Sequence, residues 1–157
     1  TRNIFPLSRK KEDTYRAGFS MGGYGAIRNG LKYHDTFGYI GAISAALLTD
    51  DLHNWGEGDD LLSSKSFAQS CFGDLNKVIG SDMDPKFLID DLIANDIEIP
   101  KIFMAVGDND FLYNENIDYY NYLKSRNVDV EFRCSSGEHT WEFCNDYIKE
   151  FIEWLPL

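Results

Sequence analysis

The sequence predicts an α/β fold in which a mostly parallel sheet is flanked by helices. Short apolar runs bounded by Gly, Pro, Asn or Asp alternate along the chain with longer segments whose apolar residues recur at helical spacing. Because a helix between consecutive strands makes a right-handed crossover, this alternation builds a parallel sheet. We expect strands over 14–17, 39–44, 101–106 and 128–133, and helices over 22–32, 85–95, 114–126 and 141–155.

The first strand and helix meet in a Gly-x-Ser-x-Gly sequence, from Gly18 to Gly22, which Gly23 follows. This pattern is the nucleophile elbow of α/β-hydrolases, a sharp turn that lifts a serine hydroxyl above the sheet. The glycines are expected because the serine backbone is strained and the helix passes close to the strand. A plain Gly/Ser turn has the same pattern. Ser20 is therefore the candidate nucleophile, and the Met21 N–H is the candidate oxyanion-hole donor.

Later segments give signals of unequal strength. The segment 45–65 is expected to be irregular, with short helices over 66–80. Asp84 and Pro85 mark a clear helix start, since Asp favours the N-cap and Pro favours the first helical position. The last helix is expected to pack in the core through apolar residues at helical spacing, namely Trp141, Ile148, Phe151, Ile152 and Leu155.

A serine nucleophile needs a base, and α/β-hydrolases place the partners in the order serine, acid, histidine. His34 and His53 precede every plausible acid, whereas His139 stands in a polar loop after the strand 128–133. His139 is therefore the candidate base.

Two aspartates are candidates for the acid. Asp108 and Asp110 both follow the apolar strand 101–106, at the strand end where open α/β sheets place their sites. Their spacing does not separate them. The other aspartate would be an ordinary turn residue that bonds its own backbone.

Several segments resemble the tributyrin esterase group, in the esterase D (putative esterase) family of α/β-hydrolases. These are the elbow, the acid segment, the histidine segment and the final helix, at 18–26, 110–113, 137–143 and 151–157. The resemblance is loosest between Leu47 and Asp96. It implies that the acid is the aspartate directly before Phe-Leu, which is Asp110, and so a triad of Ser20, Asp110 and His139.

The resemblance also implies a function: a serine carboxylesterase that hydrolyses short-chain acyl esters, including acetylated carbohydrates, without a cofactor or metal. The alternatives are an acyltransferase, a relative of the S-formylglutathione hydrolases or feruloyl esterases, and a non-catalytic α/β module with a vestigial elbow. Trp55 and Tyr113 are candidates for lining the substrate pocket, because aromatic rings form large apolar walls. Alternatively, Trp55 anchors a long loop and Tyr113 packs beneath a helix.

Chain length bounds the domain organisation. The 157 residues suffice for one domain with a real core. The resemblance implies that about half of a hydrolase domain precedes the elbow, so we expect 1–157 to be a single partial domain, the carboxyl-terminal half of an α/β-hydrolase fold. One oxyanion donor would then lie in the preceding half. The first strand would have an open edge, which a second copy of the chain could cover in a homo-oligomer.

Composition excludes several classes of partner. A net charge of −11 argues against nucleic acid or an anionic membrane as a partner. The resemblance implies a small-molecule ester as the partner. No apolar run is long enough to span a bilayer, and no Cys/His cluster indicates a metal. Three cysteines, Cys71, Cys134 and Cys144, form no Cys-x-x-Cys pair, so we expect free thiols and a cytoplasmic location.

Overall fold

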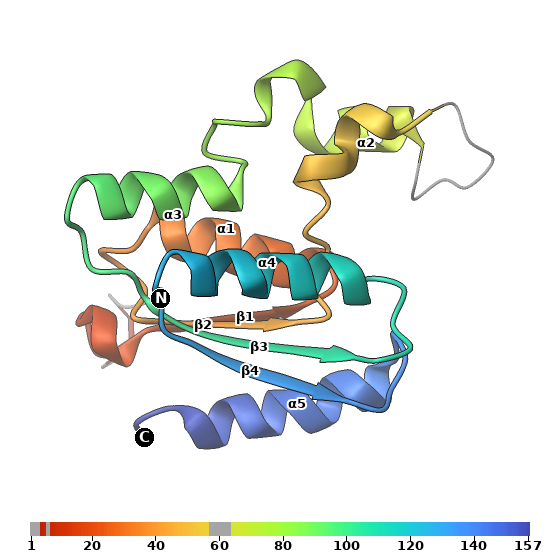
Figure 1. Ribbon diagram of the computed structural model, residues 1–157. Coiled ribbons are helices and arrows are strands. Elements are labelled where there is room, and N and C mark those ends of the chain that lie inside the picture. Colours follow the sequence, from red (N-terminus) through yellow and green to blue (C-terminus); the bar gives the residue numbers. More distant parts are fainter. Residues whose placement is uncertain (1–3, 6, 57–63) are drawn as a thin grey trace.

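The computed structural model describes residues 4, 5, 7–56 and 64–157. Four parallel strands form one sheet whose order follows the sequence, confirming the predicted parallel α/β architecture (Figure 1). The strands are β1 (Tyr15–Phe19), β2 (Tyr39–Ile43), β3 (Lys101–Gly107) and β4 (Val130–Ser135).

Helices cover both faces of this sheet. Figure 1 shows α1 and α4 on one face, with α3 beside α1, and α5 alone on the opposite face. Helix α2 stands further from the sheet, next to the short 3-10 helices of the middle segment. The helices are α1 (Met21–Lys32), α2 (Lys65–Phe72), α3 (Pro85–Ala94), α4 (Tyr113–Ser125) and α5 (Trp141–Trp154), and the 3-10 helices are η1 (Lys11–Asp13), η2 (Thr49–Asn54) and η4 (Leu75–Lys77).

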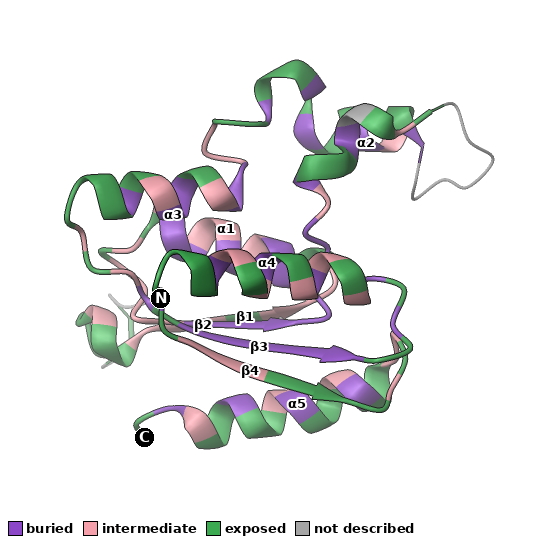
Figure 2. Cartoon of the chain, in the orientation of Figure 1, coloured by how far each residue is buried: buried purple, intermediate pink, exposed green. Residues whose placement is uncertain are grey.

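The sheet separates two apolar clusters. Successive side chains of a strand point to opposite faces, and β3 is buried along nearly its whole length (Figure 2). Ile102 and Met104 therefore join the cluster beneath α1, α3 and α4, whereas Phe103 and Ala105 join the cluster against α5. A strand that is buried on both faces has a continuous apolar sequence, as in this case.

The element boundaries differ from the predicted ones in a few places. Strand β4 begins at Val130 rather than at 128, and η2 occupies part of the segment expected to be irregular. The expectation that the last helix buries all its apolar residues is wrong for Trp141 and Ile152, which are 72% and 49% exposed. Only one stripe of α5 faces the sheet, and Phe143, Tyr147 and Phe151 supply it.

Two observations on the described residues concern the cysteines and membrane-spanning helices. The cysteines at the three positions named above all lie in this part of the chain, and all are free. Within the same ranges, no helix combines the length and the apolar character needed to cross a bilayer.

Gly41 in β2 allows α5 to pack closely on the sheet. A Cβ at this position would lie 2.7 Å from Cδ2 of the Phe151 ring. That ring is buried and contacts Phe103 and Trp154, so it has little room to move away.

We expect Gly41→Ala to lower the free energy of unfolding by about 1–3 kcal/mol, the usual cost of overpacking, in urea titrations.

Gly25→Ala is the matched control. A Cβ on Gly25 meets no atom within 4 Å among the described residues, and alanine is a better helix former than glycine. This variant should be neutral or slightly more stable. Equal losses in the two variants would contradict the proposed packing constraint.

Candidate active site

Ser20 occupies a strained turn between β1 and α1. Its φ of 57° and ψ of −121° lie in a region that residues with a side chain rarely adopt. A Cβ on Gly18 would lie 2.1 Å from the Gly22 carbonyl oxygen, and one on Gly23 would lie 2.9 Å from the Ala45 Cα. Gly18 and Gly23 are thus required by close backbone approach. For Gly22 that expectation is wrong within the described residues, since a Cβ there meets no atom within 4 Å.

Backbone hydrogen bonds hold this turn against the end of β2. The Ser20 N–H donates to the Ile43 carbonyl oxygen at 3.0 Å. The Ser20 carbonyl oxygen accepts from the N–H groups of Gly23, Tyr24 and Ala46 at 2.9, 3.1 and 3.0 Å. These four bonds fix the strained conformation from both sides, so the hydroxyl has a defined position above the sheet edge.

The structure brings Ser20, Asp110 and His139 together. His139 Nε2 lies 2.9 Å from Ser20 Oγ, and His139 Nδ1 lies 2.9 and 3.0 Å from the two Asp110 carboxylate oxygens. The Asp110 side chain is fully buried, and its Oδ1 also accepts from the Leu112 N–H at 2.8 Å. With a carboxylate beside Nδ1, the imidazole carries its proton on Nδ1, and Nε2 accepts the serine hydroxyl proton.

Asp108 contacts the histidine loop but not the imidazole. Its Oδ1 accepts from the Gly137 N–H at 3.1 Å, and its own N–H donates to the Ser135 carbonyl oxygen at 2.9 Å. The Asn109 N–H donates to the Gly137 carbonyl oxygen, also at 2.9 Å. The two aspartates that spacing could not separate therefore have different contacts: Asp110 lies against His139, and Asp108 joins the loops after β3 and β4.

Two aromatic rings enclose the imidazole of His139. Phe19 stacks on it, with ring centroids 4.5 Å apart and an interplanar angle of 28°, and Phe111 lies at the same distance with a tilt of 44°. Trp141 packs on Phe19 at 5.2 Å. The sequence reasoning missed Phe19 and Phe111. Their signal was adjacency, since each directly neighbours a candidate site residue in the chain.

The Met21 N–H lies at the amino terminus of α1, directly after the serine. Among the described residues it has no hydrogen-bond acceptor. The first N–H groups of a helix are unpaired and point along its positive dipole end, which favours an anion. This amide is therefore available to an oxyanion that forms at Ser20.

The two aromatic residues predicted to line the pocket do not contact the three central side chains in the described part of the structure. Trp55 packs against the larger apolar cluster and borders a hollow with Lys65 and Asp74. Tyr113 begins α4, is half-buried, and donates its N–H to the Asp110 carbonyl oxygen at 3.0 Å. A substrate-binding role for either residue stays a prediction.

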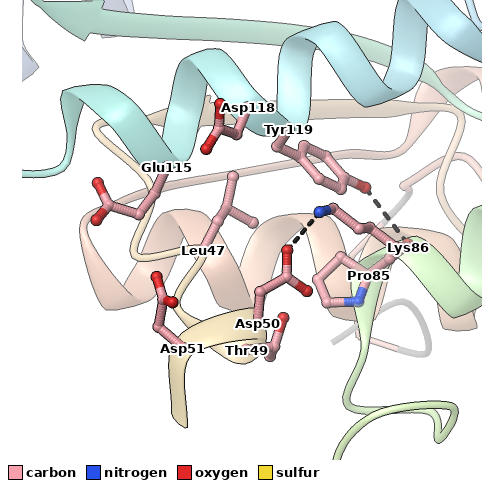
Figure 3. A pocket seen from close by; sticks show the side chains of 9 residues that line it. All are labelled: Leu47, Thr49, Asp50, Asp51, Pro85, Lys86, Glu115, Asp118 and Tyr119. Carbon is pink, nitrogen blue, oxygen red and sulfur yellow. Dashed lines mark hydrogen bonds and ion pairs between the residues drawn. The ribbon is translucent and has the colours of Figure 1, made fainter. Parts of the chain in front are cut away.

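A separate hollow of about 140 Å³ lies between η2, the start of α3 and α4 (Figure 3). Its lining is mostly charged, and Lys86 forms an ion pair with Asp50 across it. The lining residues are Leu47, Thr49, Asp50, Asp51, Pro85, Lys86, Glu115, Asp118 and Tyr119. Four carboxylates against one ammonium make this hollow unfavourable for an anionic ligand.

Cys144 is not a candidate nucleophile. Burial raises the pKa of its thiol above the ordinary value, so the thiol stays protonated at neutral pH. Ser20, by contrast, has a base at hydrogen-bond distance.

The contact with Asp110 should fix the tautomer of His139. In Asp110→Asn an amide NH₂ can face Nδ1, which favours the opposite tautomer, with the proton on Nε2. We expect ¹⁵N NMR of the imidazole to show Nδ1–H in the parent protein and a shift toward Nε2–H in this variant. Asp108→Asn is the control, because its amide oxygen can still accept from Gly137. An unchanged tautomer in Asp110→Asn would contradict the assignment.

The comparisons with known proteins show the family of the chain. The sequence profile of the family described as "Putative esterase" matches residues 4–155. The chain is 43% identical over 156 residues to an acetyl esterase of Caldicellulosiruptor saccharolyticus, covering 99% of this chain and 59% of the relative.

Solved structures of related hydrolases have the same fold. The S-formylglutathione hydrolase FrmB of Staphylococcus aureus superposes with a TM-score of 0.82 at 36% identity, covering 98% of this chain and 58% of that structure. The fluorophosphonate-binding serine hydrolase FphF of Staphylococcus aureus has a TM-score of 0.83 at the same identity and coverage. The chain thus spans about 58–59% of the length of these relatives. Since the family match extends over nearly all its residues, the chain belongs to the putative esterase family and has an α/β-hydrolase fold.

Proposed function

We propose that this chain carries the nucleophile, base and acid of a serine carboxylesterase that acts on short-chain acyl esters, acetyl esters among them. The observation that carries the proposal is the continuous hydrogen-bond chain from Asp110 through His139 to Ser20, with each link at 2.9–3.0 Å. The acetyl esterase at 43% identity supports the choice of acyl group.

In the first half of the reaction, His139 Nε2 takes the Ser20 hydroxyl proton as Oγ attacks the ester carbonyl carbon. The Met21 N–H donates to the oxyanion, and the buried Asp110 carboxylate stabilises the imidazolium. His139 then gives the proton to the leaving alcohol, and an acyl-serine remains. Water, activated by the same histidine, releases the acid and restores Ser20.

One amide donor is half of the usual oxyanion hole. In α/β-hydrolases the second N–H comes from a loop that follows an earlier strand. Removal of one donor in another serine hydrolase costs about 10²–10³ in rate, so each variant below is compared with the parent protein prepared in the same form.

The nucleophile is tested with Ser20→Ala. We expect turnover of p-nitrophenyl acetate to fall by about 10⁶-fold, and labelling by a fluorophosphonate probe to be lost, because the attacking oxygen is gone. Ser136→Ala is the control, since Ser136 is exposed in the histidine loop and should leave both readouts unchanged. Retained turnover in folded Ser20→Ala protein would overturn the mechanism, and absence of labelling in the parent would indicate a vestigial site.

A thioester is the second candidate substrate. It is favoured by the 36% identity to the S-formylglutathione hydrolase over 98% of the chain. The ratio of kcat/KM for S-formylglutathione and for a short-chain oxoester decides between the two. Product partition with an added sugar acceptor separates hydrolysis from acyl transfer, since both use the same acyl-serine.

The exposed ring of Phe111 predicts a contact with the leaving alcohol. Phe111 is 69% exposed and packs on His139, which must protonate the alcohol oxygen. Phe111→Ala should slow acylation by esters of apolar alcohols about 3- to 10-fold, as expected for loss of an aromatic contact. Deacylation involves no alcohol and should change little, which pre-steady-state kinetics can measure. Equal slowing of both steps would show that Phe111 only orients the histidine.

A further inference from the structure

We infer that Asn116 is a positioning residue that ties the acid loop to the nucleophile elbow, an inference that rests on the function proposed above. Asn116 lies in the first turns of α4, is fully buried, and does not touch the three proposed triad side chains. Its side-chain amide makes three hydrogen bonds, all with backbone groups of the loop before α4 and the loop after β2. Nδ2 donates to the carbonyl oxygens of Leu112 at 2.7 Å and Ala45 at 2.9 Å, and Oδ1 accepts from the Ala45 N–H at 3.1 Å.

The contact with Leu112 leads directly to the acid. The Leu112 N–H donates to Asp110 Oδ1 at 2.8 Å. The Leu112 carbonyl oxygen accepts from the Asn116 backbone N–H at 3.2 Å and, more closely, from the Asn116 side-chain amide at 2.7 Å. The Leu112 N–H therefore holds the Asp110 carboxylate, and the Leu112 carbonyl oxygen is in turn held by Asn116. A shift of this segment would move the carboxylate relative to His139.

The contact with Ala45 leads to the serine. Ala45 follows β2, and the N–H of the next residue, Ala46, donates to the Ser20 carbonyl oxygen at 3.0 Å. Ala45 also packs against the elbow, since a Cβ on Gly23 would lie only 2.9 Å from the Ala45 Cα. The position of the Ala45 backbone therefore limits how close the elbow can lie to the loop after β2. The Asn116 side chain bonds both the N–H and the carbonyl oxygen of Ala45, as a residue of a neighbouring strand would do in a sheet.

An asparagine side chain suits this position because its short amide carries both a donor, Nδ2, and an acceptor, Oδ1. An aspartate of the same shape would place a carboxylate against two carbonyl oxygens. A leucine of similar size would leave the Ala45 N–H without a partner, while the Ala45 carbonyl oxygen would keep only its bond from the Leu47 N–H. The amide thus couples two loops that the strand-to-strand hydrogen bonds of the sheet do not join.

The experiment compares Asn116→Leu and Asn116→Asp with Leu123→Ala in the whole protein. Leu123 is also fully buried on α4 but belongs to the apolar cluster, so its variant controls for loss of stability. Rates are normalised to the folded fraction from near-ultraviolet circular dichroism. We expect both Asn116 variants to lose about 10- to 100-fold in kcat with little change in KM, since small displacements of catalytic groups have effects of this size. Leu123→Ala should keep its kcat.

A second readout does not depend on turnover. The imidazole ¹⁵N resonances of His139 should change in either Asn116 variant, because the carboxylate beside Nδ1 moves, and should stay unchanged in Leu123→Ala. Unchanged kcat and unchanged resonances in Asn116→Asp would overturn the inference, even if Asn116→Leu failed to fold. A parent protein without Ser20-dependent turnover would instead contradict the proposed function, and the NMR comparison would still decide the role of Asn116.

Discussion

The backbone of Ser20 is the constraint on which the rest of the site depends. A residue held at a φ of 57° costs on the order of 1–3 kcal/mol, so the surroundings must fix it. Four backbone hydrogen bonds supply this, and two of them join the elbow to Ile43 at the end of β2 and to Ala46 in the loop that follows. Only glycine at 18 and 23 allows the required approach. The hydroxyl position is therefore set by sheet packing as much as by the motif.

The parallel sheet explains why residues far apart in sequence meet. The carboxyl ends of all its strands lie at one edge, and each strand is followed by a loop that has a part in the site. The loop after β1 carries Ser20, the loop after β3 carries Asp110, and the loop after β4 carries His139. The loop after β2 contributes none of these three side chains, but its backbone holds the elbow, and Asn116 joins it to the loop that carries Asp110.

Periodicity and turn residues predicted the strands, the helices and the strand-to-helix turn at Ser20, because these depend on short-range physical chemistry. Spacing did not separate Asp108 from Asp110, because the two are equivalent in sequence. The structure distinguishes them through residues that are distant in the chain, since Asp108 accepts from Gly137 and Asp110 lies against His139. Apolar character also misled for Trp141, which has the helical spacing of a core residue but lies outside the buried stripe. Such placements depend on tertiary contacts that a single sequence does not display.

The histidine shows why packing must complement hydrogen bonding at such a site. An imidazole has two polar atoms, and in His139 both are already used, Nδ1 by the acid and Nε2 by the serine. These hydrogen bonds lie at the edge of the ring and leave its faces without polar partners. Non-polar contacts cover the faces, and Phe19, whose ring stacks on the imidazole, and the tilted ring of Phe111 provide them. Because Phe19 directly precedes Ser20 and Phe111 directly follows Asp110 in the chain, a backbone movement at either partner also moves the ring beside it. The orientation of the base is thus coupled to the positions of both its partners.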